Sequence, residues 1–244
     1  MNATYVQIGA GAGDQDGRAN FRDGFTEYIK DLDPRSIHRL ILVEPNPTNI
    51  PALRKCWKDY PQAEILQIGI RTADCTEKNL VFYFAADDAP HFHAFSLRES
   101  HVRKHYPHSP IQTVTLPTIT VSELLHSIGT SIELLALDIE GIDAEIILEI
   151  DWASHPCKRV SFEFLHLGKS ARAVYDRLRN AGYFCTGWGL DVNHYDLMYE
   201  RPRSVLSWIT AKMNCFLGGW WRLGEEPVRF KIVAVVSRLR SILG

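Results

Sequence analysis

The chain has 244 residues, of which 45% are hydrophobic and 23% are charged, with a formal net charge of -2. These values are typical of one globular α/β domain with an appendage, and the small net charge gives no indication of a nucleic-acid partner. The longest apolar run near the C-terminus, residues 232–236, is far shorter than the ~20 residues that span a bilayer. Five cysteines without a CxxC pair, and N-terminal residues without a signal-peptide pattern, lead us to expect reduced thiols and a cytoplasmic protein.

Apolar strands and helical patterns alternate along the first half of the chain. The apolar runs predict strands over 5–9, 39–44, 63–70 and, at the periphery, 80–84. The helical patterns predict helices over 21–32, 48–60 and 121–128. Residues 85–111 look irregular and rich in histidine.

The second half continues this alternation. It predicts strands over 134–138 and 159–164, and helices over 144–149 and 171–181, followed by a terminal antiparallel hairpin over 183–187 and 194–200. Because near-continuous apolar strands alternate with helices, we expect a mostly parallel sheet with helices on both faces. The expected fold class is therefore α/β and Rossmann-like, with a C-terminal antiparallel hairpin.

Residues 201–244 differ in charge from the rest of the chain. They hold eight Lys and Arg but only two acidic residues, so we treat 1–200 as the main domain and 201–244 as a basic, helical C-terminal extension. Seven aliphatic residues there follow helical spacing: Val228, Ile232, Val235, Val236, Leu239, Ile242 and Leu243. Such an amphipathic helix packs on its own domain, on a second copy in a homodimer, or peripherally on an anionic inner membrane surface. All three partners stay open.

Three predicted strand ends carry groups that suit a nucleotide-like ligand. Ligands of parallel sheets bind at the carboxyl ends of the strands, near the point where the strand order reverses. The first strand ends in a glycine-rich turn over residues 9–13, which lets the backbone approach a ligand closely. The second ends in Glu44, whose carboxylate can accept hydrogen bonds from both hydroxyls of a ribose. The third ends in Gly69 and Ile70, a small and an aliphatic residue suited to a flat adenine wall.

Five segments, in this order, resemble the FkbM-type methyltransferases. They are VQIGAGAGD, LVEPNP, TLPTITVSELL, LLALDIEGIDAEII and RVSFEFLHLG. The resemblance runs from about residue 4 to about residue 200, and VEPNP and DIEGIDAEII are its specific parts. The chain departs from the family at Gly11-Ala12, where Asn-Asp or Asn-x is common. The resemblance implies a class I methyltransferase sheet, which adds a closing hairpin to a Rossmann-like core.

The resemblance also implies S-adenosylmethionine as the cofactor, with contacts at the three strand ends. The implied contacts are Gly9, Ala10, Gly11, Gly13 and Asp138 for the methionine part, Glu44, Pro45 and Asn46 for the ribose, and Gly69 and Ile70 for the adenine. Many members of the family methylate hydroxyls of sugars and polyketides. We therefore predict O-methylation of a hydroxyl on a sugar, a glycolipid, a polysaccharide or a glycosylated metabolite, so that the partner is a small-molecule or glycan acceptor.

Two strand ends beside the implied cofactor carry groups that can take a proton from a hydroxyl. Methyl transfer from a sulfonium requires an aligned nucleophile and, for a hydroxyl, a proton acceptor. His166 titrates near neutral pH and is the predicted base. Glu140 and Glu163 are candidates to orient His166, to bind hydroxyls of the acceptor or to act as the base themselves. All three residues also fit a structural role as hydrogen-bonded groups that cap strand ends.

Two sets of residues resemble metal ligands, but neither forms a defined metal motif. Asp138, Glu140 and Asp143 are carboxylates of the kind that Mg²⁺ prefers. His101 and His105 stand one helical turn apart among five histidines, the others being His91, His93 and His108, without the glutamate of an HExxH motif. We interpret the histidine stretch as a polar lid over the acceptor cleft and assign no metal.

Two other classes of protein share part of this pattern. A nicotinamide-dependent oxidoreductase would share the glycine turn and the acidic strand end, but not the DIEG strand end or the closing hairpin. A non-catalytic Rossmann-like module would have a degenerate cofactor pocket. Binding of S-adenosylhomocysteine as opposed to NAD would distinguish these alternatives.

Overall fold

The computed structural model describes residues 3–15, 23–88, 94–129, 131–139, 141–191, 195–202, 220–223 and 226–229. A seven-stranded sheet lies at their centre, in the order β3-β2-β1-β7-β8-β10-β9. Its strands are β1 (Ala3–Ile8), β2 (Ile37–Val43), β3 (Ala63–Leu66), β7 (Ile132–Leu137), β8 (Cys157–Glu163), β9 (Phe184–Trp188) and β10 (Asp196–Glu200). The first five run parallel, and β10 pairs antiparallel with both β8 and β9. The predicted mostly parallel sheet with a closing hairpin is confirmed.

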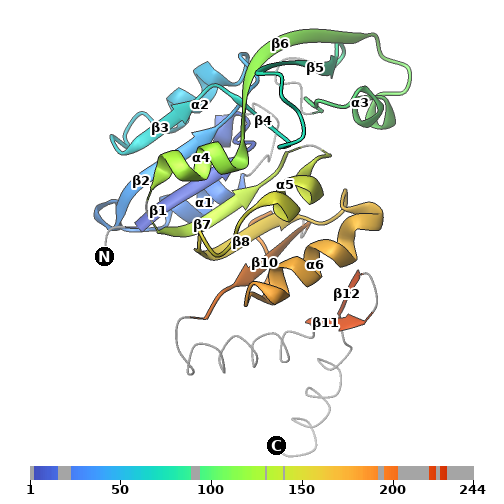
Figure 1. Cartoon of the computed structure of the whole chain (residues 1–244). Helices are drawn as coiled ribbons and strands as arrows, with labels where there is room; N and C mark the ends of the chain where they lie inside the picture. The colour runs from blue at the N-terminus through green and yellow to red at the C-terminus, as the bar shows by residue number, and fades with distance from the viewer. Residues whose placement is uncertain are drawn as a thin grey trace, which may run out of the picture.

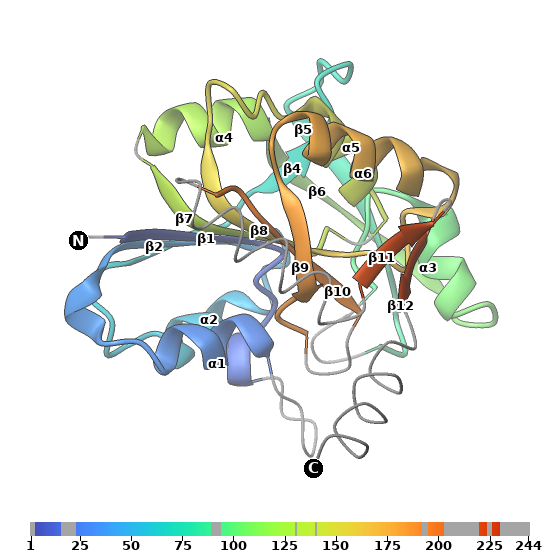
Figure 2. The same ribbon diagram turned by 90° about the horizontal axis from the view of Figure 1, so that it is seen from below.

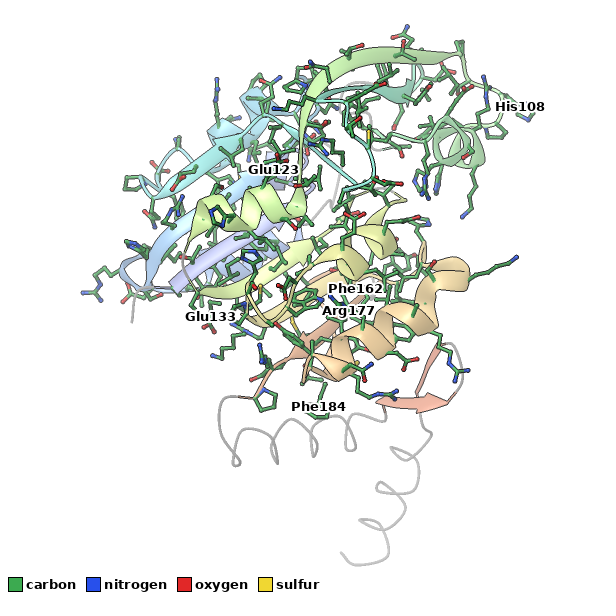
Figure 3. All side chains as sticks on the ribbon, viewed as in Figure 1. His108, Glu123, Glu133, Phe162, Arg177 and Phe184 are labelled. Atoms are coloured by element: carbon green, nitrogen blue, oxygen red, sulfur yellow. The ribbon has the colours of Figure 1, made fainter. Side chains whose placement is uncertain are left out.

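Helices cover both faces of this sheet. One face carries α1 (Gly24–Lys30) and α2 (Ile50–Cys56), and the other carries α4 (Val121–Ile128), α5 (Asp143–Glu149) and α6 (Ala171–Asn180), as Figure 2 shows. Each face has its own apolar core, so the side chains of the central strands are buried in both directions. Phe162 of β8, labelled in Figure 3, is fully buried in the core under α4, α5 and α6.

Between β3 and α4 the chain leaves the central sheet and builds a second, three-stranded one. Its strands are β4 (Gly69–Arg71), β5 (Asn79–Ala85) and β6 (Ile111–Thr120), in the order β4-β6-β5. Helix α3 (Glu99–His105) packs beside β5 on a small core of Ala85, Ala94 and Val102. Figure 1 shows this second layer, at the top, as an insertion that returns to the main sheet through α4.

Three predictions in this region are wrong. The predicted third strand over 63–70 is two strands, because β3 ends at Leu66 and the chain enters the second sheet at Gly69. Residues 85–111 are not irregular throughout, since they contain α3. The sequence predicts no strand over 111–120, where β6 has mostly exposed or half-buried residues and includes Pro117, so a regular alternation of buried and exposed positions is missing.

The predicted C-terminal helix falls mostly outside the described residues. Of its seven aliphatic positions, only Val228 is described, and it lies in β12 (Glu226–Arg229), which pairs antiparallel with β11 (Trp220–Leu223). Val228, the first position of the predicted apolar face, therefore lies in a strand, and the positions from Ile232 onward lie beyond the described part of the chain. Among the residues that the structure describes, no helix has the length and apolar character needed to cross a bilayer.

The turn after β1 requires glycine at one position in particular. Gly9 has a φ of 85°, and a Cβ atom there would overlap the backbone carbonyl oxygen of Asp138. The N–H groups of Gly9 and Ala10 both donate to the Val43 carbonyl, at 2.9 and 3.0 Å. Gly9 thus brings the carboxyl ends of β1, β2 and β7 together.

We expect Gly9→Ala to lower the free energy of unfolding by ~3 kcal/mol or more, because the methyl group meets backbone rather than a flexible side chain. Gly11→Ala is a matched control: its φ is also positive, at 54°, but a Cβ there meets no atom within 4 Å. The control should cost only ~1–2 kcal/mol. Urea unfolding followed by circular dichroism measures both variants, and equal losses would contradict the steric argument.

Candidate functional site

Glu44 holds the glycine-rich turn against the end of β2. Its Oε2 accepts a hydrogen bond from the Gly11 N–H at 2.7 Å, while Oε1 accepts from the Asn46 N–H at 2.8 Å and from the Asn49 side chain at 3.3 Å. Glu44 is only 4% exposed, so these charge-assisted bonds form away from bulk water. The carboxylate therefore fixes both the turn after β1 and the start of the segment that leads into α2.

The residues around Glu44 explain the spacing of the glycines. Gly13 has a φ of 59°, and a Cβ atom there would lie 2.8 Å from Sγ of Cys56. Gly11 also has a positive φ, a conformation that Asn tolerates better than most residues, so an Asn fits the same turn. Ala10 is buried, and Pro45 is half-buried between Glu44 and Asn46. Asn46 accepts from the Thr48 N–H at 3.0 Å and thereby shapes the entry into α2.

Gly69 and Ile70 do not lie where the sequence placed them. Both belong to β4 in the second sheet, and Ile70 is 3% exposed within the main core. The residues that directly follow β3 are Gln67, which is exposed, and Ile68, which is half-buried. The prediction that Gly69 and Ile70 end the third strand is therefore wrong.

A cavity of about 290 Å³ opens at the carboxyl ends of β1, β7 and β8. The first turn of α1, the end of α3 and the loop between β9 and β10 form its other walls. Its polar lining consists of Gln7, Asp23, His105, Tyr106, Asp138, Glu163, His166, Asp191, Tyr195 and Asp196. Carboxylates and an amide dominate this lining, so the cavity suits a ligand that donates several hydrogen bonds.

Two of the three predicted catalytic residues lie in this cavity. Glu163 ends β8 and His166 follows three residues later; Nε2 of His166 and Oε2 of Glu163 are 3.5 Å apart, and each side chain is 14% exposed. The predicted cofactor contact Asp138 lines the same cavity, directly after β7. Glu140, the third catalytic candidate, lies outside the described residues.

Of the described histidines in this stretch, one contributes to the cavity wall. His105 lines the cavity, and His101 lies behind it, 8% exposed. His108 is exposed and points away from the body of the protein in Figure 3. His91 and His93 lie outside the described residues.

Asp143 has a structural position rather than one in the cavity. It is 2% exposed, and its Oδ1 accepts a hydrogen bond from the Ile139 N–H at 2.9 Å. This bond closes the turn between β7 and α5. The structure thus separates Asp143 from Asp138, which is exposed and faces the cavity.

Sequence reasoning missed two cavity residues at the start of the chain. Gln7 lies in an otherwise apolar strand, and its amide donates to Asp23 at 3.4 Å. Its Oε1 is buried and finds no hydrogen-bond partner among the described residues. Burial also raises the pKa of Asp23, which caps α1 by accepting from the Thr26 N–H. A polar residue in an apolar strand was the signal that marks this position.

Asp196 is a third missed residue, and its environment is unusual for a carboxylate. Its Oδ2 accepts a hydrogen bond from the hydroxyl of the fully buried Ser161 at 3.0 Å, and Ser161 in turn accepts from the Leu190 N–H at 3.1 Å. Burial is the main cause that raises the pKa of Asp196 to about 6; the hydrogen bond from Ser161 opposes this rise, and the charge of the neighbouring Asp191 adds to it. In the β8–β10 ladder Asp196 stands opposite Glu163. Asp196 therefore keeps its proton to a higher pH than an ordinary aspartate does.

No cysteine lines the cavity among the described residues. Burial raises the pKa of Cys56 to about 11 and that of Cys157 to about 12, so neither forms a thiolate readily near neutral pH. The four described cysteines form no disulfide bond.

Comparison with known proteins gives one sequence family and a set of similar folds. The model of the family described as "Methyltransferase FkbM domain" matches residues 7–185. No curated protein sequence matches the chain. Among solved structures, the chain is similar to a fibrillarin pre-rRNA processing protein of Methanococcus jannaschii, with 9% identity and a TM-score of 0.42. That alignment covers 82% of this chain and 66% of the fibrillarin, just under two thirds of its length.

Two further solved structures are similar to this chain with comparable identities and TM-scores. Fibrillarin of Aeropyrum pernix, solved with natively bound S-adenosyl-L-methionine, is 10% identical with a TM-score of 0.39, over 82% of this chain and 65% of that one. Spermidine synthase from Thermotoga maritima is 12% identical with a TM-score of 0.42, over 97% of this chain and 64% of that one.

The buried carboxylate of Asp196 predicts a pH-dependent stability. Because its pKa in the folded chain, about 6, exceeds the ordinary value of 3.8, the folded state binds more protons between these limits, and stability falls as the pH rises from about 4 to about 6. Asp196→Asn removes the ionisation, so the variant should be more stable than the parent at pH 7.5 by on the order of 1–2 kcal/mol. The difference should shrink at pH 5. Thermal unfolding at both pH values tests this, and a variant less stable than the parent at pH 7.5 would contradict it.

Proposed function

This chain belongs to the FkbM methyltransferase domain family, whose methyl donor is S-adenosylmethionine, and we propose that it methylates a hydroxyl of a sugar, free or within a glycolipid, a polysaccharide or a glycosylated metabolite. The observation that carries the proposal is the cavity at the ends of β1, β7 and β8. Asp138, which lines it, packs against Gly9 of the glycine-rich turn, and its lining of carboxylates suits an acceptor with several hydroxyl groups. The family match also decides against the nicotinamide-dependent oxidoreductase.

The residues at the strand ends fit the cofactor. Gly9 and Gly13 leave no room for a Cβ atom, so the turn brings bare backbone to the site where the methionine part would bind. The buried Oε1 of Gln7 borders the cavity and can accept a hydrogen bond from an ammonium group. Gly9, Ala10, Gly11, Gly13 and Asp138 would hold the methionine part, and Glu44, supported by Pro45 and Asn46, would hold the ribose.

The chemistry then depends on a proton acceptor that the chain supplies. When bound, S-adenosylmethionine supplies a methyl group on a positively charged sulfur, which keeps the electron pair of the breaking S–C bond. The acceptor oxygen provides the electron pair for the new O–C bond and loses its proton. We assign that proton to Asp196, since a carboxylate with a pKa of about 6 accepts protons near neutral pH. Glu163, opposite Asp196, accepts hydrogen bonds from neighbouring hydroxyls of the acceptor.

His166, the base predicted from the sequence, lines the same cavity. Its ring contacts those of His101 and His105, with centroids 4.9 and 5.6 Å away. A general base must reach the hydroxyl of the acceptor, whereas a ring packed against two other imidazoles is better placed to bind a metal ion with them. For this reason the proposal places the proton on Asp196 rather than on His166.

Replacement of Glu44 tests the cofactor site. We expect Glu44→Ala to weaken S-adenosylmethionine binding by ~1–3 kcal/mol, because charge-assisted hydrogen bonds to the ribose and the support of the turn are both lost. Glu64→Ala is the matched control, since Glu64 lies on the neighbouring strand and pairs with Arg39 on the surface. Titration calorimetry measures both affinities. An unchanged affinity in Glu44→Ala would remove Glu44 from the site.

Replacement of Asp196 tests the proton acceptor. With radiolabelled S-adenosylmethionine and a panel of monosaccharides and disaccharides, Asp196→Asn should lower kcat by ~10²-fold or more and leave cofactor affinity nearly unchanged. In the parent, kcat/KM should rise with pH up to about 6 and level off above it, because only the ionised carboxylate accepts a proton. Normal turnover in Asp196→Asn across this pH range would rule out Asp196 as the acceptor.

A further inference from the structure

Three histidines from two distant segments meet at the edge of the cavity. His101 and His105 lie one turn apart on α3, and His166 follows β8. One ring nitrogen from each lies within 4.8 Å of those of the other two. The His166 ring stands nearly perpendicular to both of the others, at 86° and 89°. Imidazole nitrogens that converge in this way are typical ligands of transition-metal ions.

The contacts of α3 show that this arrangement is built into the fold. Arg98, just before α3, donates to the Gly141 carbonyl at 2.7 Å and pairs with Glu145 of α5 at 2.7 Å. Gly141 has a φ of 98°, and a Cβ atom there would lie 2.7 Å from Nδ1 of His101. The glycine of the DIEG motif thus makes room for the His101 ring, while Arg98 holds α3 beside the end of β7.

We propose that His101, His105 and His166 bind a divalent transition-metal ion of the Zn²⁺ class. Three neutral imidazoles suit zinc and its neighbours rather than Mg²⁺, which prefers oxygen ligands. Around a tetrahedral ion the nitrogens lie about 3.3 Å apart, given Zn–N bonds of 2.0–2.1 Å, so the rings close by roughly 1.5 Å on binding. His105 and His166 line the cavity, which leaves the fourth position of the ion facing the acceptor.

Glu163 is the carboxylate that often accompanies a metal-binding histidine. Its carboxylate lies 3.5 Å from Nε2 of His166, where it can help to orient the imidazole ring. The role of the ion rests on the proposed function: an acceptor hydroxyl bound at the open position has a lowered pKa and gives its proton to Asp196 more readily. The binding of the ion itself rests only on the histidines.

The test is titration of the full chain, stripped of metal by a chelator, with Zn²⁺ in a calorimeter. We expect one ion per chain with a submicromolar Kd. His105→Ala and His166→Ala should each weaken binding at least 100-fold; His105 is exposed, so its loss leaves the fold intact. His108→Ala, an exposed histidine of the same segment, is the matched control and should bind as the parent does. Substitution with Co²⁺ should add the visible absorption of a four-coordinate nitrogen site.

Two results would overturn the proposal. One is the absence of Zn²⁺ binding below millimolar concentration; the other is binding that survives the loss of His105 and of His166. Neither result involves S-adenosylmethionine or the acceptor, so a failed metal site is distinguishable from a failed methyltransferase assignment. If the cofactor binds and Zn²⁺ does not, the metal proposal alone is wrong.

Discussion

The carboxyl ends of β1 and β7 approach so closely at Gly9 and Asp138 that no side chain fits between them. This contact lies at the point where the strand order reverses. Strands β2 and β3 lie on one side of β1, and strands β7 and β8 lie on its other side. The Val43 carbonyl at the end of β2 holds the turn in place, because it accepts hydrogen bonds from the N–H groups of Gly9 and Ala10. Without this approach, Glu44 would not reach Gly11, and Asp138 would not stand beside the glycine-rich turn. The proposed cofactor side of the site is therefore a consequence of backbone packing.

The cavity that we propose for the acceptor is constructed differently, from side chains of elements far apart in the sequence. Asp196 belongs to the antiparallel hairpin, Glu163 to the last parallel strand, and His105 to the inserted layer. Ser161 links the first two of these elements, because its buried hydroxyl contacts both Asp196 and the loop after β9. This division separates a backbone cradle of nearly fixed shape from a wall whose side chains can vary with the acceptor.

The sequence predicted the central sheet well because its inner strands β1, β2, β7 and β8 are largely buried on both faces and are therefore mostly apolar. The same logic failed at β6, whose exposed residues and Pro117 resemble a loop, and at residues 63–70, where one apolar run serves two sheets. The positions of Glu44 and Glu163 at the ends of β2 and β8 were predictable, because both residues follow or end an apolar run. Asp196 and the meeting of His166 with His101 were not, since both depend on how the hairpin and the inserted layer fold back over the sheet.

The position of β1 in the middle of the sheet has a consequence for how the chain folds during synthesis. The unit from β1 to β3 is complete once residue 66 has been made, but β1 pairs on its other side with β7, beginning at Thr4 and Ile132. Until the ribosome has produced residues 132–137, an apolar strand with an open hydrogen-bonding edge is exposed. Pairings of such long sequence separation form slowly, and exposed edges favour aggregation. The same topology that creates the reversal point thus leaves the nascent chain with an aggregation-prone strand edge while the inserted layer is being translated.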